Sequence, residues 1–248
     1  HTAHELGEQL LHLARRAQDP ALLMEAHLAL GNALFWRGDF VSARAHLERV
    51  KALYDPLQHR SHTFLYGLDP GVVGLSYAAQ VLWLLGYPDQ ALRWNHEALT
   101  LAHELGHPHT LAHALGFAAS LSQFRRDAQA VEEQVEAMVA LSSAQEFPQW
   151  VAWGAILHGW VLAEQGHRAE GTAQMRQGLA AFDDIGAALG RPYWLALLAE
   201  ALGKARQAEE GLHTLAEALV AIHNTGEHRW EAEIYRLKGQ LLLALAAK

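Results

Sequence analysis

The sequence contains no cysteine in its 248 residues, which excludes disulfide bonds, a thiol nucleophile and metal sites built from thiolates. It also lacks a basic excess, because 19 lysines and arginines are outnumbered by 27 aspartates and glutamates. Domains that bind nucleic acid usually carry a basic face, so we expect no nucleic-acid partner. Uninterrupted apolar runs fall far short of the roughly 20 residues of a membrane-spanning helix. We therefore expect no membrane partner and a cytoplasmic location.

Familiar catalytic motifs are absent as well. The chain has no G-x-x-x-x-G-K-[ST] phosphate loop, no G-x-S-x-G nucleophile elbow and no H-E-x-x-H zinc motif. None of its few serines lies in a recognisable nucleophile context. The sequence thus predicts a protein that is not an enzyme and that carries no cofactor.

What the sequence does contain favours helices. Alanine and leucine dominate, while β-branched residues are scarce. The segment 30–47, LGNALFWRGDFVSARAHL, shows two amphipathic helices separated at Gly38, and Gly31 and Ala43 are small enough for the helices to cross closely. This order resembles the tetratricopeptide (TPR) repeat. We expect an all-α fold, a right-handed α-solenoid of TPR-like helix pairs.

Landmark residues recur with a period of about 40. The small residues that open each second helix are Ala43, Ala91, Ala130, Gly171 and Gly211. Gly106, Gly186 and Gly226 occupy one equivalent position at helix ends, where a left-handed glycine cap is expected. We predict a single TPR-like superhelical domain over 1–248, part of a longer chain. Its expected parts are a half repeat at 1–18, repeats at about 20–54, 70–106, 108–144, 148–186 and 191–226, and a closing helix at 229–247.

The first helices of such a solenoid line its concave side, and a 3.6-residue period selects the side chains that point inward. Carboxamides and tryptophans on one face suit a peptide or protein segment, and a small molecule such as a sugar is the alternative. Packing between helices is the favoured explanation for any one tryptophan, so the binding prediction rests on the whole set. The candidate groove residues are Asn32, Trp36, Gln80, Trp83, Gln123, Trp153, Trp160, Tyr193 and Glu200.

Histidine is unusually common, with 17 residues. Two pairs at a spacing of four, His103 with His107 and His109 with His113, flank a predicted helix corner. Imidazoles four residues apart on a helix can chelate a divalent metal. Pro108 lies between the pairs and can turn them apart, so a solvated corner is favoured and a metal site is the alternative.

The segment 55–71, DPLQHRSHTFLYGLDPG, makes the first repeat step longer than the others, and we predict an ordered loop there. This loop, together with LSYAAQVLWLLGYPDQAL and MRQGLAAFDDIGAALGRPYWLALLAEALGKARQAEEGL, resembles the C-terminal region of large bacterial signalling proteins. In that family an adenylate or guanylate cyclase domain, or another effector, precedes an AAA/STAND-type ATPase domain and a TPR tail. Tyr66 and Asp69 in the loop match distinctive positions, as do Arg191, Pro192 and Tyr193.

The resemblance implies a regulatory or sensor module that binds a protein or peptide, including other domains of its own parent chain. No catalytic residue of the cyclase or ATPase is carried by this segment. The closing helix has one apolar face, and we expect a possible homodimer through Leu237, Leu241 and Leu245.

Overall fold

The computed structural model describes residues 2–59 and 61–247, and every regular element in these ranges is a helix. His1, Arg60 and Lys248 lie outside the described residues. The chain divides into two compact units, unit 1 at 1–121 and unit 2 at 122–248, and the division falls inside one helix. The predicted all-α fold of TPR-like helix pairs is confirmed, whereas a single domain over 1–248 stays a prediction.

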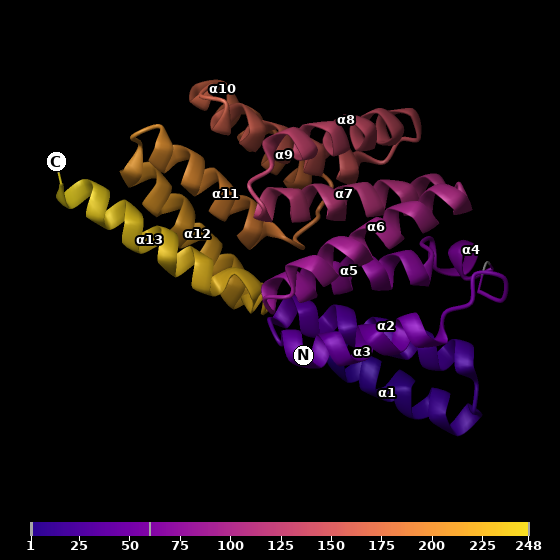
Figure 1. Ribbon diagram of the computed structural model, residues 1–248. Coiled ribbons are helices and arrows are strands. Elements are labelled where there is room, and N and C mark those ends of the chain that lie inside the picture. The colour runs from indigo at the N-terminus through magenta and orange to yellow at the C-terminus, as the bar shows by residue number, and fades with distance from the viewer. Residues whose placement is uncertain (1, 60, 248) are drawn as a thin grey trace. The chain divides into compact units, whose positions relative to one another are not determined.

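Unit 1 is built of consecutive helices that pack in pairs. In Figure 1, α2 lies beside α3 and α5 beside α6, and α1 packs against α2. The short α4 lies in the segment predicted to be a loop. The helices are α1 Thr2–Ala17, α2 Pro20–Arg37, α3 Phe40–Leu53, α4 His62–Tyr66, α5 Pro70–Leu84, α6 Pro88–Leu105 and α7 Pro108–Phe124, whose last turn belongs to unit 2.

Unit 2 repeats the same arrangement. The helix α9 packs against both α8 and α10, α11 pairs with α12, and α13 packs on α12 and α11 (Figure 1). The elements are α8 Ala128–Ala144, α9 Pro148–Glu164, α10 Arg168–Asp184, α11 Arg191–Lys204, α12 Ala208–Thr225, a 3-10 turn at His228–Trp230, and α13 Glu231–Ala246.

Proline and aspartate mark the helix starts. Proline opens α2, α5, α6 and α9, where its missing N–H has no intrahelical partner. Asp19 and Asp127 precede α2 and α8, and each accepts hydrogen bonds from backbone N–H groups of the first turn. Gly38 and Gly226 end α2 and α12 in the left-handed conformation.

Small residues allow the paired helices to approach closely. A Cβ on Gly31 would lie 2.8 Å from Leu47 Cδ2, as the predicted crossing of α2 and α3 requires. In unit 2, a Cβ on Gly159 would lie 2.6 Å from the carbonyl oxygen of Gly171. Because real Cβ atoms do not sit that close to backbone, α9 and α10 meet at a distance that only glycine permits. In the described ranges, none of the helices is both long and apolar enough to cross a membrane.

Candidate functional site

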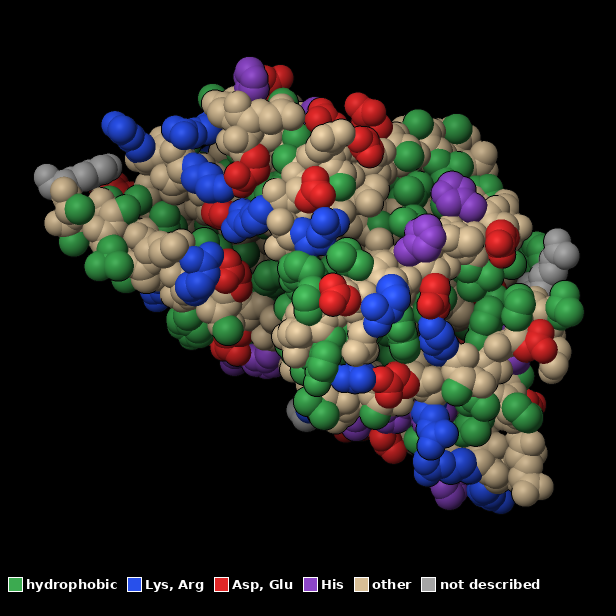
Figure 2. All heavy atoms as spheres, in the orientation of Figure 1, with side chains coloured by type: hydrophobic (Ala, Val, Ile, Leu, Met, Phe, Trp, Pro, Cys, Tyr) green, Lys and Arg blue, Asp and Glu red, His purple; other side chains and the backbone are tan. Residues whose placement is uncertain are grey.

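A cavity with charged walls lies among the first helices of the repeats in unit 2. It has a volume of about 380 Å³ and is lined by the turn after α7, by the C-terminal half of α11 and by α13. Figure 2 shows basic and acidic side chains interspersed over α11 and α13. We call this cavity the charged pocket; its charged and amide side chains are Arg126, Glu200, Lys204, Arg236 and Gln240.

Four side chains at the charged pocket form a closed ring of alternating charge. Arg126 Nη1 lies 2.7 Å from Glu200 Oε1 and 3.4 Å from Glu164 Oε1. Lys204 Nζ pairs with the same Glu164 oxygen and lies 3.3 Å from Glu200 Oε1. The ring therefore links the turn after α7 with α9 and α11. Exposed ion pairs contribute only about 0.2–1 kcal/mol each, so a charged group of a ligand can replace one of them.

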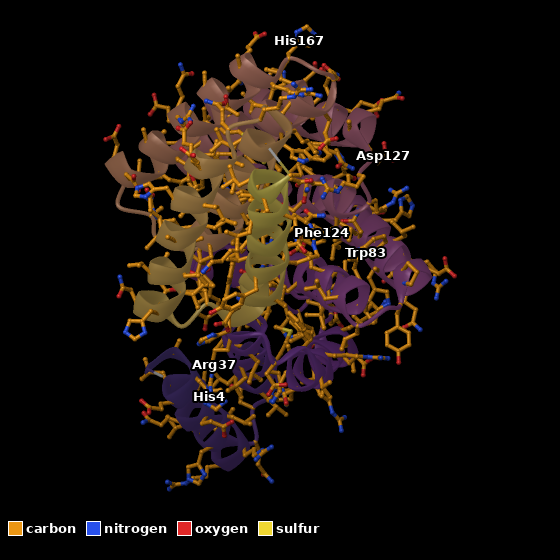
Figure 3. The ribbon with its side chains drawn as sticks, turned by 90° about the vertical axis from the view of Figure 1, so that its left-hand side faces the viewer. His4, Arg37, Trp83, Phe124, Asp127 and His167 are labelled. Carbon is orange, nitrogen blue, oxygen red and sulfur yellow. The ribbon has the colours of Figure 1, made fainter. Side chains whose placement is uncertain are left out.

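Arg126 is held in an unusual backbone conformation. Its φ is 61°, in the left-handed region that glycine favours, and equivalent turns 40 residues before and after it contain Gly86 and Gly166. Figure 3 labels Phe124 and Asp127, which stand on either side of the turn. The Asp127 N–H donates to Ser122 O, which closes the C-terminal cap of α7. A left-handed arginine costs about 1–2 kcal/mol relative to glycine, and here it brings a guanidinium into the ring.

Arg236 adds a third cation at the same place. Its Nε donates to Glu233 Oε2 at 2.6 Å. This hydrogen bond, reinforced by the charges of Glu233 and Glu200, raises the pKa of Arg236. Of the described residues that line the charged pocket, none carries a hydroxyl, thiol or imidazole group. The arrangement can therefore bind groups of either sign.

The predicted groove residues of unit 2 separate into two sets. Glu200 lies in the charged pocket and Gln123, Trp153, Trp160 and Tyr193 are buried. The Tyr193 hydroxyl and the Gln123 carboxamide oxygen hydrogen bond to each other at 2.8 Å. The placement of these four on an open groove is corrected, because their side chains are buried between the helices.

The predicted groove residues of unit 1 also differ from one another in burial. Gln80 is buried and its Nε2 donates to Phe117 O at 3.3 Å, which corrects its placement on an open face. Trp36, Asn32 and Trp83 are half-buried, so a role in ligand binding stays a prediction for them. Burial of Gln80 and Gln123 leaves Asn32 as the one partly exposed carboxamide of the candidate set, which weakens the support for hydrogen bonding to a sugar.

The predicted loop residues have opposite environments. Tyr66 is exposed, whereas Asp69 is fully buried and caps α5 by accepting from the Val72 N–H at 3.0 Å. Its other oxygen accepts from the Tyr54 hydroxyl at 2.9 Å. Burial raises the pKa of Asp69, and burial beside this carboxylate raises the pKa of Tyr54. Asp69 is thus a structural cap, and a binding role for Tyr66 stays a prediction.

The histidine corner is not built as a metal site. His107 Nδ1 lies 2.9 Å from Thr110 Oγ1 at the start of α7, and His109 Nδ1 lies 3.2 Å from the Gly67 carbonyl oxygen. His113 is buried and stacks on Phe117, whereas His103 is exposed. Across residues 2–59 and 61–247, no three His, Cys, Asp or Glu side chains are placed to hold a metal ion. The geometry of this corner therefore gives the metal alternative no support.

The apolar face of α13 packs against other helices of unit 2. Leu237 and Leu241 are buried. A Cβ on Gly211 of α12 would lie only 2.8 Å from Leu241 Cδ1, so this leucine packs directly on α12. Leu242 and Leu243 are the exposed leucines of α13. The placement of Leu237 and Leu241 on an exposed face is therefore corrected, because both side chains are buried against α11 and α12, whereas Leu245 is half-buried and a homodimer through the end helix stays a prediction.

Sequence reasoning missed Arg126 and Lys204. A usable signal was present, because Glu164 and Lys204 occupy equivalent positions 40 residues apart and carry opposite charges. Comparing charges at equivalent positions of successive repeats would have identified the pair. The third ring member, Arg126, required knowledge of the turn conformation.

Comparison with known proteins gives the fold but no family. No family model matches the chain. An uncharacterized protein of Rhizobium meliloti (strain 1021) is 24% identical over 239 residues, which cover 96% of this chain and 23% of that protein. The chain thus spans less than a quarter of the length of this relative.

Two solved structures are similar in fold. A Rap protein complexed with competence and sporulation factor superimposes with a TM-score of 0.60 at 12% identity, over 94% of this chain and 68% of the Rap chain. Aspartyl phosphate phosphatase F from Bacillus subtilis gives a TM-score of 0.57 at 10% identity, over 98% of this chain and 63% of that one. The chain therefore has the all-α helical-repeat fold found in Rap proteins.

Proposed function

We propose that this chain is a non-catalytic interaction module that binds a peptide or a protein segment at the charged pocket of unit 2. The ring of Arg126, Glu164, Lys204 and Glu200 is the observation that carries the proposal. A peptide bears both donors and acceptors, together with charged side chains or termini. Groups of both signs at one cavity match that chemistry better than they match a simple anion or cation.

The similar proteins support a binding role. One of the two solved structures is a Rap protein complexed with competence and sporulation factor, so this type of helical array can hold a ligand. The resemblance to bacterial signalling proteins supports a wider role as a cytoplasmic sensor tail of an ATPase or cyclase. Coverage of less than a quarter of the Rhizobium meliloti relative is consistent with such a tail, and the partner can then be another domain of the same parent chain.

Affinity selection from a random decapeptide library tests the proposal. Selected peptides are expected to lose about tenfold or more in affinity for Glu200→Gln and Lys204→Gln, because each change removes a charge that the bound peptide is proposed to contact. Arg206→Gln is the matched control, since Arg206 is exposed and has the same left-handed conformation two repeats after Arg126, at a φ of 63°. The proposal fails if no peptide is enriched, or if peptides bind the ring variants as tightly as the wild type.

A further inference from the structure

A second hollow lies on another face of unit 2, between α8 and α10. Two adjoining cavities of about 570 and 440 Å³ share Val151 and Ala155 of α9 as their floor. One extends toward Phe147 and the other toward His158. We call the combined hollow the α8–α10 trough. It runs along α8 from Val135 to Ser143, which is about 12 Å, or roughly two helical turns.

Small residues make the trough deep. A Cβ on Gly154 of α9 would lie 3.3 Å from Met138 Cε, and a Cβ on Gly178 of α10 would lie 2.9 Å from Ala152 O. α9 is therefore drawn closely against both neighbours, and α8 and α10 stand above it as two walls. Val139 of the α8 wall and Val151 and Ala155 of the floor are partly exposed, so the trough presents apolar surface to a partner.

The trough is separate from the charged pocket. Ala155 and Glu164 are nine residues apart on α9, which is two and a half turns of 3.6 residues. They therefore point in opposite directions from the helix axis. The proposed peptide site and the trough lie on opposite faces of α9, and a partner can occupy either one without blocking the other.

The charge of the α8 wall restricts what can bind. The helix α8 carries three glutamates and no lysine or arginine. Glu136 lines the trough, and Glu146 lies at its mouth beyond the end of α8. Within the described part of the chain, neither carboxylate forms an ion pair. On the opposite wall, α10 contributes the uncharged Gln174 and Gln177. A partner is therefore expected to be basic along the side that faces α8 and uncharged along the other.

The backbone at Glu146 points to the same place. Its φ is 58°, whereas the equivalent positions after α6, α10 and α12 contain Gly106, Gly186 and Gly226 with φ values of 62°, 68° and 76°. A glutamate in this conformation costs about 1–2 kcal/mol relative to glycine. This conformation holds a carboxylate at the mouth of an apolar trough.

From these observations we infer that the α8–α10 trough docks an amphipathic helix of a protein partner, with a small apolar face on Val151 and Ala155 and with lysine or arginine beside Glu136 and Glu146. An extended strand fits less well, because both walls are helices whose backbone hydrogen bonds are already made and which offer no sheet edge. A helix inserts its apolar side chains into such a groove at i, i+3, i+4 and i+7.

Two designed peptides of about 16 residues, long enough to form a helix, test the inference. Both carry the same alanine and leucine face; one is flanked by lysine and the other by glutamate. Fluorescence anisotropy should show that the lysine peptide binds the full chain at least about tenfold more tightly than the glutamate peptide, with a difference that shrinks at high salt. Ala155→Trp fills the floor and should abolish binding, and Glu136→Gln should weaken binding of the lysine peptide alone.

Ala173→Trp is the matched control, because Ala173 is exposed on α10 and does not line the trough. It should leave binding unchanged, and circular dichroism should show that both tryptophan variants are folded. The inference is overturned if the two peptides bind equally, if neither binds at about 1 mM, or if Ala155→Trp has no effect. It is also overturned if Ala155→Trp abolishes self-association of the chain while no peptide binds, because the occupant is then a second copy.

Discussion

Replacing Glu146 with glycine is expected to stabilise unit 2. Glycine adopts the left-handed φ of 58° without strain, which raises the free energy of unfolding by about 1–2 kcal/mol. Glycine also increases the backbone entropy of the unfolded chain, which lowers the free energy of unfolding by about 0.4–1 kcal/mol. The Glu146 side chain is exposed and contributes little of its own. The net gain is about 0.5–1 kcal/mol, or a rise of roughly 1–4 °C in Tm for a chain of this length.

Urea denaturation followed by tryptophan fluorescence is the appropriate assay, because the buried Trp160 and Trp194 both lie in unit 2. Glu146→Ala keeps the left-handed strain and should leave stability nearly unchanged. Gly186→Ala introduces the same strain at an equivalent turn where a Cβ meets nothing within 4 Å, and after the same entropy offset it should cost about 0.5–1 kcal/mol. If Glu146→Gly is no more stable than Glu146→Ala, backbone strain at this turn is not significant and the reasoning is refuted.

Three further predictions follow from buried groups. Burial lowers the pKa of His113 to about 3, so the unfolded chain binds more protons than the folded chain between pH 3 and 6.5. The free energy of unfolding should therefore fall by up to about 5 kcal/mol as the pH decreases through that window. His113→Gln should make this pH dependence flatter in urea titrations at several pH values. Tyr54→Phe leaves one oxygen of the buried Asp69 without its hydrogen bond and should cost about 1–3 kcal/mol in equilibrium unfolding, with no change if the bond is unimportant. Gly159→Ala would place a Cβ 2.7 Å from Met175 Cγ and closer still to a backbone oxygen of α10. Calorimetry should therefore show that the free energy of unfolding falls by about 2 kcal/mol or more. An unchanged Tm would contradict the close contact between α9 and α10.

The helix pairs could be predicted from the sequence because their determinants are local. Pro20 and Pro148 open helices, Gly38 and Gly226 close them, and the chain near each residue decides its conformation. The short helix α4 was missed because a single turn has too few residues to show a period.

The candidate site was less predictable for two physical reasons. Trp160 and Tyr193 were placed on an open face, although α9 and α11 are apolar on all sides, a pattern typical of helices buried on both faces. Arg126 and Glu146 could not be recognised, because arginine and glutamate favour the helix interior and nothing in their residue type indicates a left-handed turn. Only the comparison with glycine at equivalent positions reveals them.

The regular spacing of these turns also has an evolutionary consequence. Gly86, Arg126, Gly166 and Arg206 are separated by 40 residues each and share one backbone conformation. A deletion or duplication of 40 codons between two such turns joins the end of one helix to the start of an equivalent helix. The pattern of helix pairs is therefore preserved. The number of repeats can therefore change in one genetic event, and a charged residue at such a turn can be gained or lost together with its whole repeat.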